Sequence, residues 1–397
     1  MDTPGIGARI RQLRGNTMTQ RELADRSGVS LSLVRALEQE QRHTASINSL
    51  QRLARALDTG VATLLGTTAT MPNGPDSGIV AIRAALTPVD DLIAEVVYPS
   101  EPLTAKEAHR TADYLWGAYW SGKYNLLGQL LPDALVRLRA TFKSVTSAER
   151  PEVAAALARA YQAAGDTLVH LGHPDTAWLA IREALIAAKT GNDELLAAAM
   201  RVSVSWQLLV AGRYKEAEQV AMTAASEIEP AGGSELPQLT AYGTLTVTAA
   251  TAAARALQPD RTAELLAVSK EVAGRVGRDR ADHQTTFGPA KVAMLAVDCA
   301  VVLDRYPEAL AAAKELPRDG ALPLASRARH LADLSYVHTR LGNDDTALTM
   351  LLTMEQMAPD WIRYQSLPRQ VVADLLQRRT PATRLRQLAR RLGVVGP

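Results

Sequence analysis

The side chains that most often perform catalysis occur in this sequence, but not in the groupings that catalysis requires. His170 and His173 lie close to Asp166 and could begin a metal site, yet no second cluster completes a coordination shell. The segment 117–124, GAYWSGKY, nearly matches the phosphate-binding pattern G-x-x-x-x-G-K-[ST], but Tyr124 stands where a small hydroxyl must reach magnesium. The sequence therefore predicts no enzyme, no metal site and no cofactor.

The single cysteine and the hydropathy pattern bear on where the protein works. Cys299 lies in an apolar stretch and cannot form an internal disulfide, so we expect a small buried side chain. The N-terminus has no apolar signal region, and no run approaches the roughly 18 apolar residues of a membrane span. We expect a cytoplasmic protein with no membrane partner.

The stretch 19–38, TQRELADRSGVSLSLVRALE, has the signals of two short helices joined by a tight turn. Thr19 and Glu22 have the spacing of a capping box, and Gly28 stands where a helix ends in the left-handed conformation. Ser30 can cap the second helix, whose apolar residues are spaced to bury one face. This arrangement is a helix-turn-helix, and its second helix can enter a DNA major groove.

The residues in this stretch carry a family likeness. The patterns Thr19-Gln20-x-x-Leu23-Ala24, Gly28-Val29-Ser30 and Val34-x-x-Leu37-Glu38 resemble the Cro/repressor-type helix-turn-helix of Xre-like transcription regulators. The likeness covers roughly residues 5–66, and the chain departs from it at Glu40, where the family usually has glycine. It implies a five-helix DNA-binding domain over 1–66 that binds double-stranded DNA at an inverted-repeat operator.

The resemblance also implies roles for individual residues. Gln20 is expected to hold a phosphate, while Leu31, Ser32 and Arg35 face the groove, where arginine is the usual reader of guanine. The predicted DNA-binding residues are Thr19, Gln20, Arg21, Ser30, Leu31, Ser32, Arg35 and Arg42. Structural roles fall to Gly28 and to a pair between Arg14 and Glu38, for which the alternative is two separate surface charges.

Composition indicates how the rest of the chain must position such residues. The 397 residues are 47% hydrophobic and only 4% aromatic, alanine is abundant, and no alternating run of strand length stands out. We therefore expect an all-α fold. Net charge is +2, but residues 1–66 carry +3, residues 367–397 carry +6 and the middle carries −7. The acidic middle argues against DNA wrapping along the whole molecule, and the arginine-rich tail is either a capping helix or a further DNA contact.

From residue 79 onward a turn motif recurs. Each copy ends one helix, turns, and places a small residue at the start of the next, with intervals of 40, 46, 46 and 38 residues. This pattern resembles the tetratricopeptide repeat, whose helix pairs stack into a superhelix with a concave groove; the alternative is an irregular helical bundle. We expect a repeat domain over 79–397, joined by a linker at 67–78 that is rich in turn-forming residues. The aligned residues are Ala177, Ala217, Ala263, Ala309 and Ala347.

Some positions on the first helix of each pair face the groove in such stacks. Here they hold charges of both signs beside aromatic residues, which suits an amphipathic ligand. Peptide-pheromone receptors of similar architecture grip their peptides with asparagines, and none of these positions is Asn. A small signalling molecule is thus favoured over a peptide; otherwise the groove charges are solvated or paired with one another. The predicted ligand-binding residues are Trp116, Arg159, Gln162, Asp166, His170, Trp206, Arg255, Lys291, Asp298, Arg329 and Tyr336.

Together these patterns predict a sequence-specific DNA-binding transcription regulator. Its repeat domain would mediate homodimerisation and bind an effector, either a small molecule or a peptide. The alternative is an adaptor whose repeats bind a protein partner, with DNA binding secondary.

Overall fold

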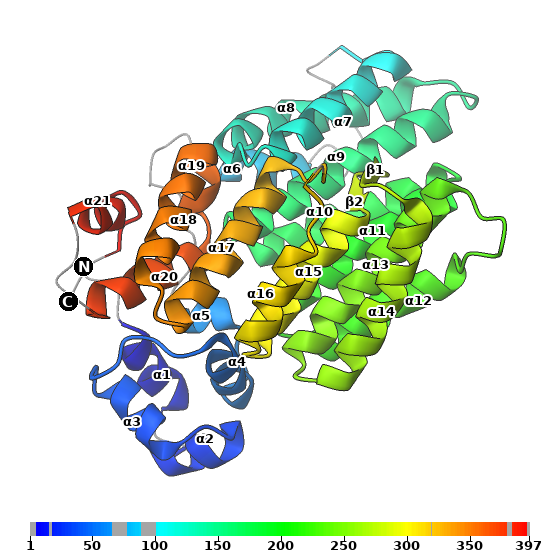
Figure 1. Ribbon diagram of the computed structural model, residues 1–397. Helices are drawn as coiled ribbons and strands as arrows, with labels where there is room; N and C mark the ends of the chain where they lie inside the picture. The colour runs from blue at the N-terminus through cyan, green and yellow to red at the C-terminus, as the bar shows by residue number, and fades with distance from the viewer. Residues whose placement is uncertain are drawn as a thin grey trace.

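Five short helices at the N-terminus pack into one unit, which we call the head, and the remaining helices stack in pairs beside it (Figure 1). The computed structural model describes residues 5–15, 18–65, 78–88, 101–318, 320–378 and 383–394. The predicted linker lies outside this described part, apart from Gly78. The head consists of α1 (Ile6–Arg14), α2 (Gln20–Ser27), α3 (Leu31–Glu38), α4 (Ile47–Ala56) and α5 (Val61–Leu65).

The helix ends in the head follow from the residues that cap them. The Thr19 hydroxyl accepts a hydrogen bond from the Glu22 backbone N–H at 3.1 Å, and the Glu22 carboxylate accepts one from the Thr19 N–H at 2.6 Å, which completes the capping box. Gly28 ends α2 with φ +67°, and the Ser30 hydroxyl caps α3 at the Leu33 N–H. The expected helix-turn-helix is therefore present.

Two details of the head differ from the sequence pattern. Glu40 has φ +58°, so the turn after α3 adopts the left-handed conformation although glycine is absent there. In α1, Leu13 has the helical spacing of the buried face, three residues after the fully buried Ile10, but is 41% exposed. Gly7 lets α1 approach α3 closely, because a Cβ atom there would lie 1.9 Å from the Leu37 carbonyl oxygen.

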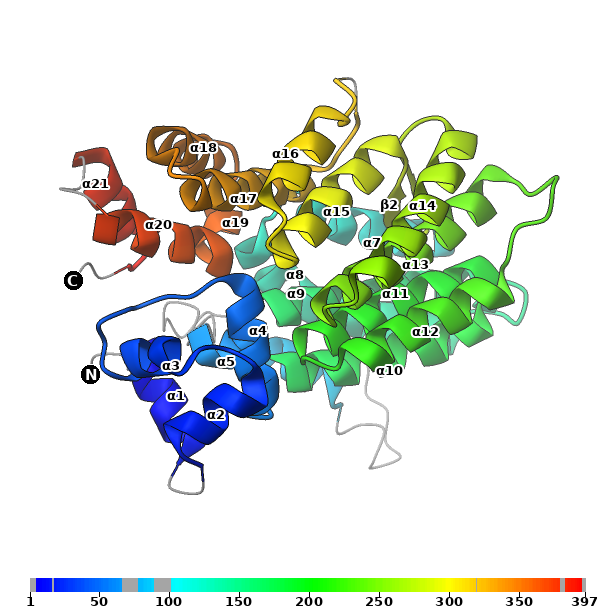
Figure 2. The same cartoon turned by 60° about the horizontal axis from the view of Figure 1, so that its bottom comes forward.

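The repeat domain consists of antiparallel helix pairs, as the recurring motif predicts, and the all-α class is confirmed. In each pair the first helix faces inward and the second lies outside it (Figures 1 and 2). Before the pairs comes the single helix α6 (Ile79–Leu86), which packs on two of the helices that follow. These are α7 (Ala105–Trp120), α8 (Tyr124–Ser144), α9 (Arg150–His170), α10 (Pro174–Thr190), α11 (Glu194–Val210), α12 (Tyr214–Glu227), α13 (Leu236–Arg255), α14 (Pro259–Val276), α15 (Pro289–Val302), α16 (Tyr306–Lys314), α17 (Leu324–Arg340), α18 (Asp344–Met357), α19 (Pro359–Arg363), α20 (Ser366–Arg378) and α21 (Thr383–Arg391).

The turns inside these pairs share one backbone conformation. This conformation shows that one aligned residue, Ala263, was chosen in the wrong register. Each turn has a single residue in the left-handed conformation, for example Gly172 and, in the copy aligned on Ala263, Leu257. Five residues after it comes the small side chain that packs between the two helices. Counting from Leu257 makes Thr262 that residue, and Thr262 is buried while Ala263 is exposed. The choice of Ala263 was thus wrong by one position, because an alanine stood directly beside the true site.

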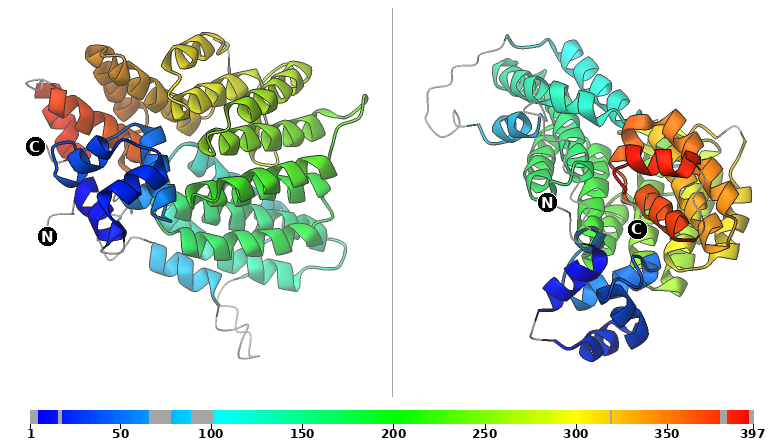
Figure 3. Two further views of the ribbon diagram at one scale, coloured as in Figure 1. Left: turned by 90° about the horizontal axis from the view of Figure 1, so that it is seen from below. Right: turned by 90° about the vertical axis from the view of Figure 1, so that its left-hand side faces the viewer.

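The stack curves far enough for its last helices to contact its first. Helix α17 contacts α7, and α19 contacts α8. The Tyr364 hydroxyl donates a 2.6 Å hydrogen bond to the side-chain oxygen of Asn125, and the Trp361 side chain packs on Gly122. The right-hand view in Figure 3 shows the first helices of the stack, in cyan, next to its last helices, in orange and red. The repeat domain is therefore closed on itself and not an open solenoid.

A short β-hairpin interrupts the repeats, which the sequence did not predict. Strands β1 (Arg280–Asp282) and β2 (Thr285–Phe287) pair antiparallel, and the two turn residues between them both have positive φ. Phe287 is fully buried against α13 at Gly243, where a Cβ atom would lie 2.1 Å from the Phe287 ring. The glycine therefore fixes the hairpin at the inner surface of the stack.

The arginine-rich tail forms helix α21, which packs on α20 as the capping alternative predicts. Leu385 and Leu388 are buried, and Arg391 forms an ion pair with Glu355 at 2.6 Å. Among the helices described in the structure, none is long and apolar enough to cross a membrane.

Candidate functional site

The exposed face of α3 carries most of the residues predicted to touch DNA. Ser32 and Arg35 are exposed and Leu31 is half-buried, and Arg35 has no hydrogen bond or ion pair to any residue that the structure describes. The Ser30 and Ser32 hydroxyls lie 3.0 Å apart at the start of this helix. Figures 1 and 2 show α2 and α3 on the outer side of the head, away from the repeats. Thr19, Arg21 and Arg42 are exposed on the same domain.

A buried carboxylate at the end of α3 links this helix to α1 and α2. Glu38 accepts hydrogen bonds from Arg14 Nε at 2.8 Å and Nη2 at 3.1 Å, so the expected pair is present. It also accepts one from the Gln20 side-chain amide at 2.8 Å. Burial raises the pKa of Glu38, but the hydrogen bonds from Arg14 and Gln20 outweigh burial and leave the pKa below its usual value. The Gln20 side chain thus binds this pair, whereas the family resemblance implied that it holds a phosphate.

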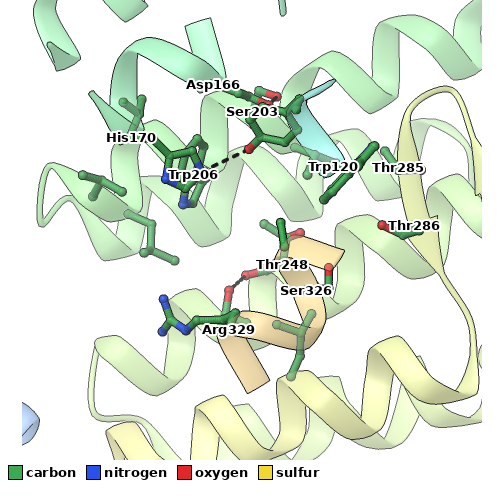
Figure 4. Close-up of a pocket in the computed structure, with 18 of the residues that line it drawn as sticks. Trp120, Asp166, His170, Ser203, Trp206, Thr248, Thr285, Thr286, Ser326 and Arg329 are labelled. Carbon is green, nitrogen blue, oxygen red and sulfur yellow. Dashed lines mark hydrogen bonds between the residues drawn. The ribbon is translucent and has the colours of Figure 1, made fainter. Parts of the chain in front are cut away.

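The inner surface of the repeat domain contains a pocket of about 430 Å³, within the range of small-molecule sites. In Figure 4, Asp166, Ser203, His170 and Trp206 lie on one side of it and Thr248, Ser326 and Arg329 on the opposite side. Every inward-facing helix from α7 to α17 contributes to its wall. The predicted ligand-binding residues that line the pocket are Trp116, Gln162, Asp166, His170, Trp206, Arg255, Lys291, Asp298 and Arg329.

One end of the pocket is strongly charged. Asp298 accepts hydrogen bonds from Arg255 at 2.8 and 3.0 Å and from Arg329 at 2.7 Å. Burial opposes ionisation of Asp298, yet Arg255 and Arg329 hold its pKa well below the usual range. Arg329 also bonds Asp333, whose pKa burial raises to about 7. Lys291 lines the pocket beside this network and forms no ion pair with the residues that the structure describes.

The other end is aromatic. The rings of Tyr124 and His170 stack at 4.7 Å between centroids, and Trp206 lies 5.0 Å from His170. The Tyr119 hydroxyl lies 3.3 Å from His170 Nε2, and the Trp116 indole N–H donates to the Arg159 carbonyl at 3.0 Å. Burial lowers the pKa of His170 to about 3, so the imidazole is neutral. This wall is aromatic, and one carboxyl group lies on it.

That carboxyl group belongs to Asp166, which ends a buried hydrogen-bond chain. Gln162 donates to the Ser203 hydroxyl at 3.0 Å, and Ser203 donates to Asp166 Oδ2 at 3.0 Å. The remaining acceptors, Asp166 Oδ1 and Gln162 Oε1, have no partner among the described residues. Burial raises the pKa of Asp166 to about 7. Unpaired acceptors at a pocket wall favour a ligand that brings a hydrogen-bond donor.

Two predicted residues lie outside the pocket. Arg159 is paired with Asp113, and Tyr336 is buried where the head meets the repeats. Sequence reasoning also missed lining residues that come from the unexpected hairpin, from aromatic residues on either side of the turn between α7 and α8, and from the far end of the repeat domain. The main ones are Tyr119, Trp120, Tyr124, Thr285, Thr286, Trp361 and Tyr364.

The head docks on the repeats through α4. The Ile47 N–H donates to the Tyr336 hydroxyl at 3.1 Å, the Ser46 hydroxyl donates to Asp304 at 3.1 Å, and the Gln370 amide donates to the Ala45 carbonyl at 3.0 Å. The Ile47 side chain packs beside Ala254, the buried Cys299 and Val302. These contacts join α4 to α13, α15, α17 and α20.

Taken together, the chain combines a helix-turn-helix head with a helical repeat domain that encloses a pocket. Residues 10–64 match the helix-turn-helix family model, which identifies the head. No protein with a curated description matches the sequence.

Two solved structures resemble the fold at low sequence identity. One, from a functional characterization of Pseudomonas aeruginosa pilF, is 17% identical, with 64% of this chain and 98% of that chain covered and a TM-score of 0.33. The other, a Rap protein complexed with competence and sporulation factor, is 12% identical, with 91% and 99% covered and a TM-score of 0.45.

Proposed function

We propose that this protein is a cytoplasmic, sequence-specific transcription regulator in which α3 reads DNA and the pocket binds an effector. The observation that carries the proposal is the orientation of the head. Its reading helix exposes Ser32 and Arg35 to solvent, while its opposite side, α4, packs on the helices that line the pocket. DNA affinity and pocket occupancy can therefore influence each other through one interface.

The path between the two sites is short. Helix α17 carries Arg329 in the pocket and Tyr336 at the head, and α15 carries Asp298 and leads directly into Asp304. The Arg255 side chain binds Asp298, and its carbonyl accepts a 3.5 Å hydrogen bond from Arg55 of the head. A ligand that binds more tightly to one placement of these helices would shift the head, and thereby DNA affinity.

The proposal includes a two-fold dimer on an inverted-repeat operator. One head covers only a few base pairs, and genomic DNA offers many competing sites. Two heads related by a two-fold axis would read half-sites about one helical turn apart, or a multiple of that distance. The repeat domain is the larger surface available for the dimer contact.

Selection of bound duplexes from a random DNA pool, followed by fluorescence anisotropy, tests the DNA-reading role. We expect a preferred inverted repeat, and Arg35→Ala should weaken binding by about 1–3 kcal/mol and relax preference at one base pair of each half-site. Arg182→Ala, which removes an exposed arginine of α10, is the matched control and should change neither property. Recovery of no preferred sequence, or equal behaviour of the two variants, would contradict the assignment of α3.

A further inference from the structure

We infer that the pocket binds a small amphipathic organic anion, with a flat apolar body against the aromatic wall and an acidic group at Lys291. The inference deepens the proposed function, because it names the chemical class of the effector. It depends on the charges at one end of the pocket, the aromatic rings at the other, and the closure of the repeat domain.

The charged end has a cation available for an anionic ligand. Three cations line it, Lys291, Arg255 and Arg329, and Asp298 is the carboxylate that lines the pocket there. Asp298 is fully engaged by the two arginines. Asp279 bonds the Lys291 backbone N–H at 3.1 Å but does not line the pocket. The Lys291 ammonium group therefore remains without an ion-pair partner in the described part of the chain, and an acidic group on a ligand would supply one.

Neutral donors line the same pocket. Thr286 in β2 is buried and lines the pocket, and its hydroxyl has no partner among the described residues. Ser326, at the start of α17, lines the pocket as well. Figure 4 shows Thr286 and Ser326 on neighbouring parts of the wall. A carboxylate or sulfonate offers several acceptor oxygens, so it can satisfy an ammonium group and a hydroxyl together.

The opposite end selects a flat apolar body. His170 and Trp206 present ring surfaces there, and aromatic side chains bind planar groups by stacking or edge contacts. Asp166 Oδ1 and Gln162 Oε1 are unpaired acceptors at the same wall. A ligand that carries a hydroxyl or N–H on its ring system would satisfy them, and thereby remove the cost of leaving them unpaired.

The closed shape of the repeat domain favours a small molecule over an extended chain. Trp361 and Tyr364, from the end of the stack, line the same pocket as Trp116 from its beginning. The contact between Tyr364 and Asn125 bridges the two ends. The remaining space of about 430 Å³ matches the volume of small-molecule pockets.

Two fluorescent probes that differ only in an acidic group test the inference on the full-length protein. 1-Anilinonaphthalene-8-sulfonate has two aromatic ring systems, an N–H and a sulfonate, and N-phenyl-1-naphthylamine lacks only the sulfonate. We expect the sulfonate to bind more tightly. Lys291→Met should lower the affinity for the sulfonate probe by about 10- to 100-fold and the affinity for the neutral probe by less than about twofold. Lys314→Met, an exposed lysine at the end of α16, is the matched control and should leave both affinities unchanged.

Equal affinity for the two probes, or an unchanged affinity of the sulfonate for Lys291→Met, would overturn the inference. Trp206→Leu provides a second check, because it should weaken both probes if they occupy the pocket. DNA affinity, measured on the same samples with and without the sulfonate probe, tests the proposed function separately. Sulfonate binding that needs Lys291 but leaves DNA affinity unchanged would keep the ligand class and contradict the effector role.

Discussion

Replacement of Glu38 by glutamine should loosen the head without changing its shape. The carboxylate accepts three hydrogen bonds, at 2.8, 3.1 and 2.8 Å, and its side chain is fully buried. Glutamine is nearly isosteric but uncharged, and its amide nitrogen would face donors on Arg14 and Gln20. Loss of charge from such a buried pair should cost about 3 kcal/mol of head stability.

The head contains no tryptophan, tyrosine or phenylalanine, so its opening is best measured by amide hydrogen exchange on the full chain. A loss of about 3 kcal/mol corresponds to roughly 100-fold faster exchange at the most protected amides of α2 and α3. Asp25→Asn, which removes an exposed charge from α2, is the matched control and should exchange at the native rate. If the amides of α2 and α3 exchange at the same rate in Glu38→Gln as in Asp25→Asn, the buried pair does not stabilise the head.

The same group predicts a pH dependence. The pKa of Glu38 is lower in the folded head than the value of about 4.3 expected in an unfolded chain. Its stabilising contribution is therefore complete above about pH 5 and is lost as the pH falls through the folded-state pKa. Protection of the head amides from hydrogen exchange should therefore decrease as the pH falls. In Glu38→Gln this protection should decrease less, because the variant has no carboxylate to protonate at this position.

Other substitutions test the remaining features. Gly243→Val should collide with Phe287 and destabilise the repeat domain by about 1–3 kcal/mol or more in denaturant unfolding, whereas Gly274→Ala, in open space on α14, should not destabilise it. Tyr336→Phe removes the acceptor of the Ile47 N–H and should speed exchange at the start of α4, by an amount equivalent to about 0.5–1.5 kcal/mol, while the exposed Tyr114→Phe should have no effect. Burial lowers the pKa of Lys291 to about 8; Asp298 and Asp279 raise this pKa, and Arg329 lowers it further. The affinity for the sulfonate probe should therefore fall as the pH rises above about 8. An affinity that does not change with pH would contradict the role of Lys291. Light scattering on the full chain should give twice the mass of one chain, and the mass of a single chain would contradict the predicted dimer.

Local signals were sufficient to predict the head. Capping by Thr19 and Ser30 and the left-handed turn at Gly28 each depend on a few neighbouring residues, so the sequence shows them directly. The repeating turns of the second domain were equally visible, and they set the register that placed Asp166 and Asp298 on the inner face. Short-range geometry and periodicity carried both predictions.

The rest depended on contacts between distant segments. The place of Trp361 in the pocket follows from the curvature of the whole stack, which accumulates from small rotations between pairs. The hairpin depends on Phe287 meeting Gly243, residues far apart in the sequence. Tyr336 repeats the register of Asp298 but contacts the head, because the position of the head is not encoded in any repeat.

The contact between the two ends of the repeat domain has a consequence for synthesis of the protein. In an open array each repeat needs only its neighbours, so folding can follow the growing chain. Here the wall of the pocket includes Trp116 near the beginning and Ser366 near the end of the repeat domain. The pocket is complete only after the ribosome has released nearly the whole chain, and a truncated product would have stacked helices but an unfinished binding site.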